Sequence, residues 1–190
     1  MTSFDLAGIA IHLDEETQRE IVSDPQGLLA WCQAHPADPR TVAGLRILGR
    51  LDEAAIAGRQ ALAEEVSSPL MRAVRRTRYA HVLQWQGAFV AAEEQLDLAA
   101  EESGLEDPTS PSSLSILASV FQHRAKCRFE HALAERRDQR PLAAGRLWEA
   151  ALEDAQRALY MRERLGVVEQ DVIDSSRRLV RRLERRDLAG

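Results

Sequence analysis

Three residues that can bind a metal ion, His123, Cys127 and His131, recur every four positions in one stretch of the chain. Residues four apart lie on one face of an α-helix, so neighbouring members of this set could share an ion. The two histidines, however, would lie roughly 12 Å apart along such a helix and cannot meet at one ion. No partner pair with comparable spacing is visible in the sequence. We therefore interpret the three as packing and surface residues, and expect neither a metal nor a cofactor.

Arginines are clustered twice. A stripe near the C-terminus could bind an acidic segment or RNA, and consists of Arg177, Arg178, Arg181, Arg182, Arg185 and Arg186. Acidic residues are interleaved with it, which favours the solvated face of a capping helix. The second cluster, Arg72 to Arg78, is interpreted as the counterpart of the acidic stretch from Glu93 to Glu102. No phosphate-binding glycine loop, zinc-protease histidine pair or nucleophile motif is present, so we expect that the protein is not an enzyme.

The composition favours helices throughout. Of the 190 residues 45% are hydrophobic, Ala, Leu, Glu and Arg dominate, and aromatic and β-branched residues are sparse. We expect an all-α protein with a single domain spanning residues 1 to 190. The net charge of -5 and the pI of about 5.6 argue against a general affinity for nucleic acid or membrane surfaces.

Two cysteines far apart in the sequence do not indicate a disulfide framework. No apolar stretch approaches the length needed to cross a bilayer, and the N-terminus lacks the features of a signal peptide. We therefore expect a cytoplasmic protein. The use of Arg rather than Lys and the high Ala content are typical of a high-GC bacterial genome.

Helix boundaries can be predicted from capping residues and prolines. The apolar segment from Met1 to His12 could lie against the first helices or pair with another chain. Asp14 to Thr17 is typical of a helix start, and this helix is expected to end near Ser23. The next is expected to begin at Asp24 and Pro25 and to end at His35 and Pro36. Further helices are predicted over residues 39–48, 52–66, 69–86, 88–103, 111–137, 141–165 and 169–187.

A pattern recurs three times in these helices. A turn residue is followed by a large apolar residue and then by two alanines seven positions apart, as in Gly49, Leu51, Ala54 and Ala61; Gly87, Phe89, Ala92 and Ala99; and Arg146, Trp148, Ala151 and Ala158. The first residue would close a turn between two helices. The alanines, on one helix face, would let the helix axes approach closely.

These positions resemble the tetratricopeptide repeat (TPR) family. The resemblance implies a right-handed superhelix, with N-terminal helices in residues 1–37, three helix pairs in residues 38–165 and a capping helix in residues 166–190. The small residues Ala80 and Ala118 fit the first helix of such pairs. The family's Trp near the start and Pro at the end of each repeat are missing, and the interval before the third unit is long. The alternative is an irregular helical bundle rich in alanine.

The resemblance also implies where a partner would bind. In the family a concave groove is lined by first-helix residues, which here are Thr77, His81, Gln84 and Trp85, with Arg78 adjacent. In the third unit two registers share Gln122 and add either His123 or Lys126. Trp85 could instead belong to the core between units. We name these positions the first-helix set, Thr77, Arg78, His81, Gln84, Trp85, Gln122 and Lys126.

The expected function is that of a protein or peptide interaction module. The alternatives are a chaperone or adaptor similar to those of bacterial secretion systems, and a regulatory sensor that binds a small molecule or a signalling peptide. Homodimer formation is a further alternative, because the segment from Phe4 to Leu13 is apolar.

Overall fold

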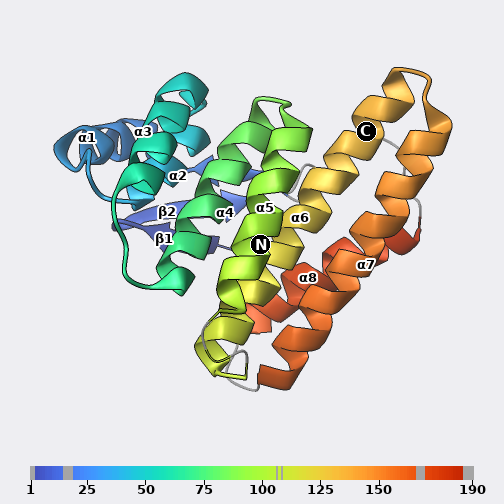
Figure 1. Ribbon diagram of the computed structural model, residues 1–190. Helices are drawn as coiled ribbons and strands as arrows, with labels where there is room; N and C mark the ends of the chain where they lie inside the picture. Colours follow the sequence, from blue (N-terminus) through green and yellow to red (C-terminus); the bar gives the residue numbers. More distant parts are fainter. Residues whose placement is uncertain (1–2, 15–18, 106, 108, 166–169, 186–190) are drawn as a thin grey trace. The chain divides into compact units, whose positions relative to one another are not determined.

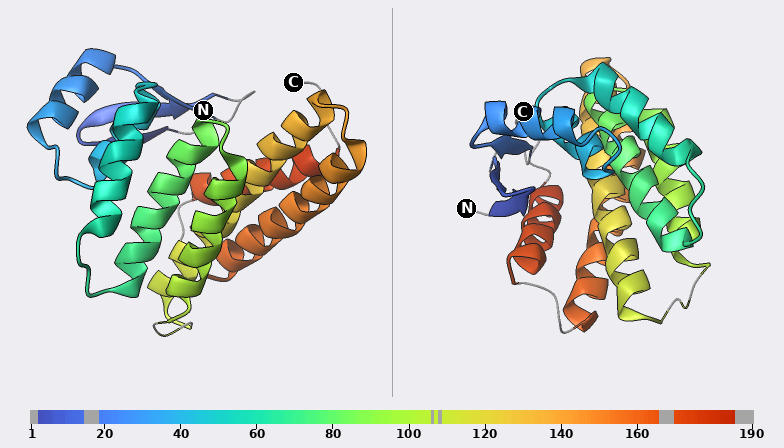
Figure 2. Two further views of the ribbon diagram at one scale, coloured as in Figure 1. Left: turned by 45° about the horizontal axis from the view of Figure 1, so that its top comes forward. Right: turned by 90° about the vertical axis from the view of Figure 1, so that its left-hand side faces the viewer.

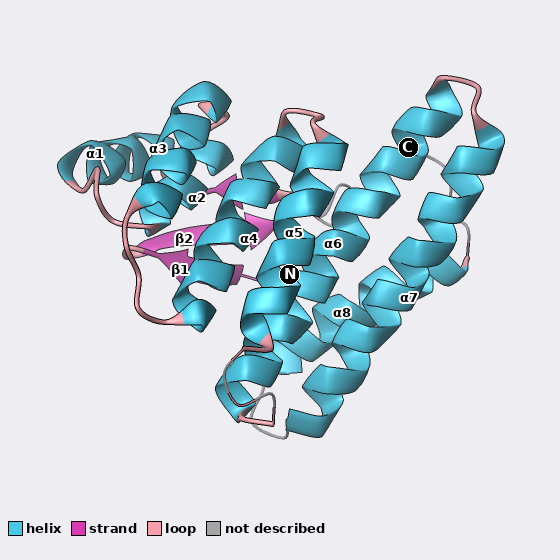
Figure 3. Ribbon diagram, in the orientation of Figure 1, coloured by secondary structure: helices cyan, strands magenta, loops and turns pink. Residues whose placement is uncertain are grey.

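The computed structural model describes residues 3 to 14, 19 to 105, 107, 109 to 165 and 170 to 185. The contacts divide the chain into two compact units, Met1–Glu65 and Val66–Gly190. Figure 3 shows that the described strands are confined to the first unit and that helices make up the described part of the second. The expected helical class is therefore confirmed in its coarse form, with a small sheet in addition.

The sheet of the first unit has the strands β1 (Ser3–Leu6), β2 (Ile9–Leu13) and β3 (Glu20–Val22), antiparallel and in the order β1-β2-β3. A two-residue turn joins β1 to β2, with φ of 60° at Ala7 and 83° at Gly8. Positive φ at both positions is the conformation that matches the twist of a hairpin. The Gly8 amide donates to the Asp5 carboxylate over 2.7 Å. Ile11, in the central strand, is fully buried.

The helix expected between Asp14 and Ser23 is wrong at its C-terminal end, where β3 lies. Residues 15 to 18 fall outside the described part of the chain. Glu20 of β3 accepts two hydrogen bonds from the buried Arg46 guanidinium, each of 2.9 Å. Two parallel charge-assisted bonds fix the orientation of both side chains. For Glu20–Val22, long-range pairing of this kind outweighs local helix propensity.

Three helices complete the first unit, α1 (Pro25–Ala34), α2 (Arg40–Ile47) and α3 (Leu51–Ala63). Asp24 caps α1 as expected, since its carboxylate accepts from the Gly27 amide over 2.9 Å. Close packing explains the glycine in α2. A Cβ atom at Gly44 would lie 2.6 Å from the Cys32 sulfur of α1, so only glycine allows this approach.

The second unit consists of α4 (Pro69–Trp85), α5 (Phe89–Ser103), α6 (Pro111–Arg137), α7 (Pro141–Leu165) and α8 (Gln170–Glu184). Figure 1 shows α4 and α5 side by side and antiparallel, and α6 and α7 arranged in the same way. Ser68 and Ser110 cap α4 and α6. The predicted bounds of α6 and α7 are confirmed, and α8 ends within the range predicted for the last helix. None of the described helices is both long and apolar enough to span a membrane.

One type of turn joins three helix pairs. Its central residue has a left-handed backbone, with φ of 73° at Gly49, 77° at Gly87 and 61° at Gln139. The amide that follows each bonds back five residues, as from Ala88 to the Leu83 carbonyl over 2.9 Å and from Arg140 to the Glu135 carbonyl over 2.8 Å. Such bonds satisfy carbonyls at the end of a helix. The expected turns at Gly49 and Gly87 are confirmed.

The prediction that Arg146 is the third turn residue is wrong, because Arg146 lies inside α7. The turn is at Gln139, seven positions earlier. A shift of seven residues keeps the same face of a helix, so the alanine pattern survives it. Ala151 and Ala158 are buried, as are Ala92 and Ala99 of the second pair.

Helix α8 packs against the α6–α7 pair, on the other side of α6 from α5 (Figure 2). Its residues Leu179, Val180 and Leu183 join a core cluster with Phe129 and Trp148. The Trp148 indole nitrogen donates to the Leu183 carbonyl over 2.9 Å, which anchors the end of α8.

The expected division into residues 1–37, 38–165 and 166–190 stays a prediction. The helix pair α2 and α3, assigned to the first repeat, lies in the first compact unit, and the other pairs lie in the second.

Candidate functional site

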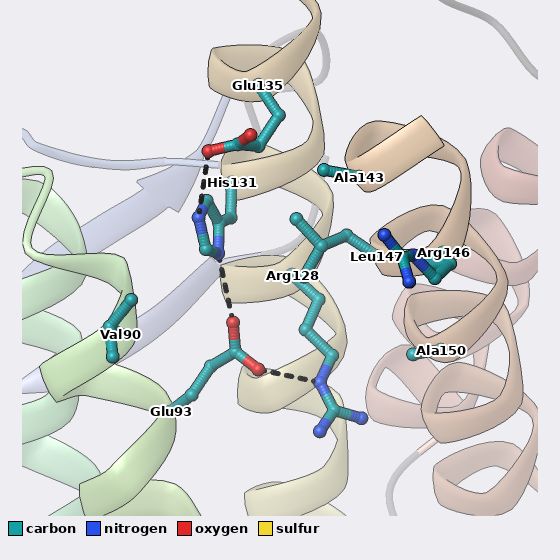
Figure 4. Close-up of a pocket in the computed structure, with 9 residues that line it drawn as sticks. All are labelled: Val90, Glu93, Arg128, His131, Glu135, Ala143, Arg146, Leu147 and Ala150. Atoms are coloured by element: carbon teal, nitrogen blue, oxygen red, sulfur yellow. Dashed lines mark hydrogen bonds and ion pairs between the residues drawn. The ribbon is translucent and has the colours of Figure 1, made fainter. Parts of the chain in front are cut away.

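A groove runs between α5, α6 and α7 in the second unit, with a cavity volume of about 530 Å³. Figure 4 shows the residues that line it, which come from all three helices: Val90, Glu93, Arg128, His131, Glu135, Ala143, Arg146, Leu147 and Ala150. We name it the α5–α7 groove. Its volume lies within the range of roughly 300 to 1,000 Å³ that is typical of ligand sites.

His131 stands between two carboxylates on the floor of the α5–α7 groove (Figure 4). Its Nδ1 lies 3.1 Å from Glu93 Oε1, and its Nε2 lies 3.6 Å from Glu135 Oε1. The ring also stacks on Phe89, with centroids 5.1 Å apart and planes inclined by 15°. Contacts on both edges and on one face fix the orientation of the imidazole.

Arg128 extends this chain of charges into the interior. Its Nε donates to Glu93 over 3.0 Å, and its Nη1 donates to Asp154 over 2.8 Å. Asp154 is only 2% exposed and also accepts two bonds from Arg124, of 2.8 and 2.7 Å. One buried carboxylate of α7 therefore holds two guanidinium groups of α6.

Arg124 shows how strongly these charges are coupled. Burial lowers its pKa, but the hydrogen bonds that it donates to Asp154 and then to Asp97 outweigh that effect and raise the pKa above its ordinary value. The guanidinium is therefore permanently charged. The ion pairs form a fixed framework behind the α5–α7 groove.

The walls and rim of the groove are more apolar than its floor. Val90 of α5 is 63% exposed, and Ala143, Leu147 and Ala150 of α7 face it across the groove (Figure 4). Arg146 is exposed at the rim and makes no ion pair within the described part of the chain. The arrangement offers apolar contact, rigid charges and one cation available to a bound molecule.

The structure buries much of the first-helix set. The Thr77 hydroxyl donates to the Ala73 carbonyl of its own helix over 2.8 Å. His81 is 8% exposed, and its ring meets that of His123 edge-on, with centroids 4.4 Å apart. Gln84 is buried as well. The structure thus brings His81 together with His123, the residue that one of the two registers of the third unit places in the groove. The two rings pack against each other.

Gln122 is buried against α8. Its amide nitrogen donates to Ser175 over 3.4 Å, and its carbonyl accepts from Ser176 over 2.6 Å. Arg78, Trp85 and Lys126 are half-buried. Thr77 is half-buried as well, so these four members of the first-helix set retain more surface than His81, Gln84 and Gln122.

The three potential metal ligands of α6 lie in different surroundings. Cys127 is buried with its sulfur 3.8 Å from the Phe89 carbonyl, and burial raises its thiol pKa. His123 contacts His81, whereas His131 lies in the α5–α7 groove. Within the described residues, no three His, Cys, Asp or Glu side chains are grouped so that they could hold a metal ion.

The sequence prediction missed the groove residues Glu93, Arg128, Glu135 and Arg146 as a group. Arg124 and Arg128 are four apart and thus share a helix face, which was a weak signal. The expected pairing of the cluster Arg72 to Arg78 with the acidic helix is confirmed, since Arg76 and Arg72 lie 2.9 and 3.4 Å from Glu102.

No protein-family model, curated protein or solved structure matches the chain. The resemblance to tetratricopeptide repeats therefore stays a prediction.

Proposed function

We propose that the chain is a tetratricopeptide-like scaffold, with its helix pairs stacked as a right-handed superhelix, and that it binds a segment of a partner protein. The like turns at Gly87 and Gln139 and the buried alanines behind them support this proposal. Repeated helix pairs stack into extended surfaces suited to polypeptide ligands. The proposed role is binding and not catalysis.

The observation that carries the proposal is the α5–α7 groove. Its floor is held by bonds from His131 and Arg128 to Glu93, so these side chains lose little further freedom when a partner binds. Exposed Val90 and the alanines of α7 provide apolar contact. Rigid polar groups beside an apolar wall are typical of specific recognition sites.

The charges of the groove indicate the chemistry of the partner segment. Glu93 and Glu135 already accept from side chains of this chain. Arg146 has no such ion pair within the described residues, so an acidic side chain of the partner would complement it. An apolar residue would fit between Val90 and Leu147. We therefore propose a segment with an apolar anchor and an acidic residue beside it.

The other functions expected from the sequence differ in what they would need. A small-molecule sensor would be favoured by a closed apolar pocket, whereas the α5–α7 groove is open and carries five ionisable side chains. A secretion-type chaperone would use the same groove for an extended client. It is a variant of the proposal and not a separate mode of binding.

The half-buried members of the first-helix set give a second candidate surface. The family resemblance points to Arg78, Trp85 and Lys126, which lie on α4 and α6. A partner held there would contact cations and one aromatic ring. Variants that reverse the charges of Arg78 and Lys126 distinguish binding at this surface from binding in the α5–α7 groove.

Partner capture with matched variants tests the proposal. The full-length chain serves as bait, and the proteins that it recovers are quantified by mass spectrometry. We expect Val90→Ser combined with Arg146→Glu to reduce the recovered partner by about tenfold or more, as for residues at the centre of an interface. The control, Tyr160→Ser with Arg164→Glu, changes the same kinds of exposed side chain on α7 outside the groove.

A second double variant, Arg78→Glu with Lys126→Glu, reports on the first-helix set. If only this variant loses the partner, the binding site lies on the surface formed by the first-helix set and not in the α5–α7 groove. If the partner is recovered equally with all three variants, or if no partner is enriched over a bait-free control, the proposed function is wrong.

A further inference from the structure

Arg162, in the last turn of α7, carries its charge into the interior between α6, α7 and α8 and is only 7% exposed. Arg46, the other deeply buried arginine among the described residues, bonds to the carboxylate of Glu20. Arg162 has no described carboxylate within ion-pair distance. A buried charge without a counter-charge is strongly unfavourable. Burial lowers the pKa of Arg162 to about 10, so the group is still charged at neutral pH.

The two ends of the Arg162 guanidinium are used unequally. Nη1 donates to the Gln122 side-chain carbonyl, to Ser176 Oγ over 2.5 Å and to the Val172 carbonyl over 3.4 Å. Nη2 has one long contact, 3.5 Å to Ser119 Oγ. Nε makes no hydrogen bond to any residue in the described part of the chain. The bonds of Nη1 therefore fix the group, while the edge formed by Nε and Nη2 has unused donors.

This unused edge has the geometry that binds oxyanions. The N–H groups on Nε and Nη2 are parallel and match the two oxygens of a carboxylate or phosphate. Ser119 beside it is half-buried, and Ser115, one turn earlier on α6, is exposed. The Ser119 hydroxyl now donates to the Ser115 carbonyl over 3.1 Å, and rotation would turn it toward a bound anion. Ser119 thus links the Arg162 cluster to the exposed Ser115.

We propose that the Nε–Nη2 edge of Arg162, together with the Ser119 hydroxyl, is a binding site for an oxyanion, either a carboxylate or a phosphate group. The anion enters from the Ser115 side of α6 and supplies the counter-charge that the described residues lack. The site is separate from the α5–α7 groove and does not depend on the function proposed for it.

Anion binding at this site would also strengthen the attachment of α8. Arg162 and Gln122 are joined to Ser176 of α8 by hydrogen bonds. A ligand that binds only when these groups are assembled stabilises the assembled state. The bound anion should therefore raise the thermal stability of the protein.

Anion titration of the full-length chain tests the site. Sodium phosphate and sodium acetate are added separately, with sodium chloride keeping the ionic strength constant, and the unfolding temperature and the heat of binding are measured. We expect a saturable rise in the unfolding temperature. Ser119→Ala should weaken binding about two- to tenfold, as expected for one lost hydrogen bond. Arg162→Lys keeps the charge but loses the planar edge, and should weaken binding about tenfold or more.

Arg181→Gln is the matched control, because it removes an exposed positive charge of α8 away from the cluster. It should bind the anion like the original chain. A response to phosphate alone assigns the site to phosphate groups, and a response to acetate as well assigns it to carboxylates. If Arg162→Lys does not fold by circular dichroism, Ser119→Ala decides. The proposal is overturned if neither anion gives a saturable response, or if Ser119→Ala binds as tightly as the original chain.

Discussion

At the scale of single residues, the second unit depends on a few buried charges. Asp154 bonds to both Arg124 and Arg128. None of these pairings could be predicted from the sequence, because they depend on how α6 and α7 are rotated against each other. The sequence predicted one pairing between helices, that of the cluster Arg72 to Arg78 with the acidic stretch from Glu93 to Glu102. The other charges were interpreted as solvated helix faces, which is why the contact between Glu93 and Arg128 was missed.

Replacing Asp154 by Asn should destabilise the protein by about 3 kcal/mol or more, because two guanidinium groups lose their buried counter-charge. The free energy of unfolding in urea measures this effect. Asp97→Asn is the control. Asp97 also pairs with Arg124 but is 53% exposed, so its loss should change the stability by about 0.5 kcal/mol or less. Equal losses in the two variants would contradict a special role for Asp154.

Cys127 should resist alkylation in the folded protein. Burial, and then the nearby Glu93, raise its thiol pKa above the ordinary 9.0, so the reactive thiolate is scarce at pH 8.5. In the unfolded chain the thiol ionises near 9, so its contribution to stability falls as the pH rises above that value. Iodoacetamide labelling followed by peptide mass spectrometry should show slow reaction of Cys127 in buffer and fast reaction in urea. Fast labelling in buffer would contradict this prediction.

At the scale of elements, the helices were predictable where capping residues and prolines mark their ends. Asp24 before Pro25 and Ser110 before Pro111 are confirmed as helix starts. The break between residues 137 and 141 was predicted, but Gln139 was not recognised as the turn residue of the third unit, because Gln carries no preference for a left-handed backbone, whereas Gly does.

Gly87 should be the least replaceable residue of the turn between α4 and α5. Alanine there has room, but the φ of 77° costs an L-residue about 1 to 2 kcal/mol. Gly145→Ala is the matched control. Gly145 lies within α7 with nothing near its Cβ position, so alanine there should stabilise the protein by up to about 1 kcal/mol. In urea, the free energy of unfolding should fall for Gly87→Ala and rise for Gly145→Ala. A change in the same direction for both variants would refute this interpretation of the turn.

The small sheet was not predicted, although part of its signal is present in the sequence. Phe4, Leu6, Ile9 and Ile11 alternate on either side of Ala7 and Gly8, which is the pattern of a hairpin. Its apolar residues were interpreted as a possible dimer surface. Leu6 and Ile11 are buried, while Phe4 stays partly exposed. Dimerisation through this segment stays a prediction.

At the scale of the whole molecule, composition predicted a mainly helical chain but not its division into two compact units. That division follows from long-range contacts, which composition does not record. The repeat pattern continued across the boundary, from the turn at Gly49 to the turn at Gly87, and therefore gave no sign of it.

The segment between α3 and α4 should be an early site of proteolysis. Glu64 and Glu65 are exposed and follow the end of α3, whereas most glutamates of the described part lie within hydrogen-bonded helices. Brief digestion with a Glu-specific protease should release a fragment that begins at Val66 or Glu65. The double variant Glu64→Gln with Glu65→Gln should delay the release of this fragment. Earlier cleavage inside α5 would contradict the compactness of the second unit.

The most direct test of the central claim is site-specific photo-crosslinking of the α5–α7 groove. A photoreactive phenylalanine replaces Val90 at the rim of the groove or, as the control, Tyr160, which is exposed on α7 outside it. Illumination in cells that produce the full-length chain should give a discrete adduct from position 90 that contains a segment of one partner protein, and no such adduct from position 160. Adducts that are the same at both positions, or none at position 90, would contradict the proposal that this groove binds a partner segment.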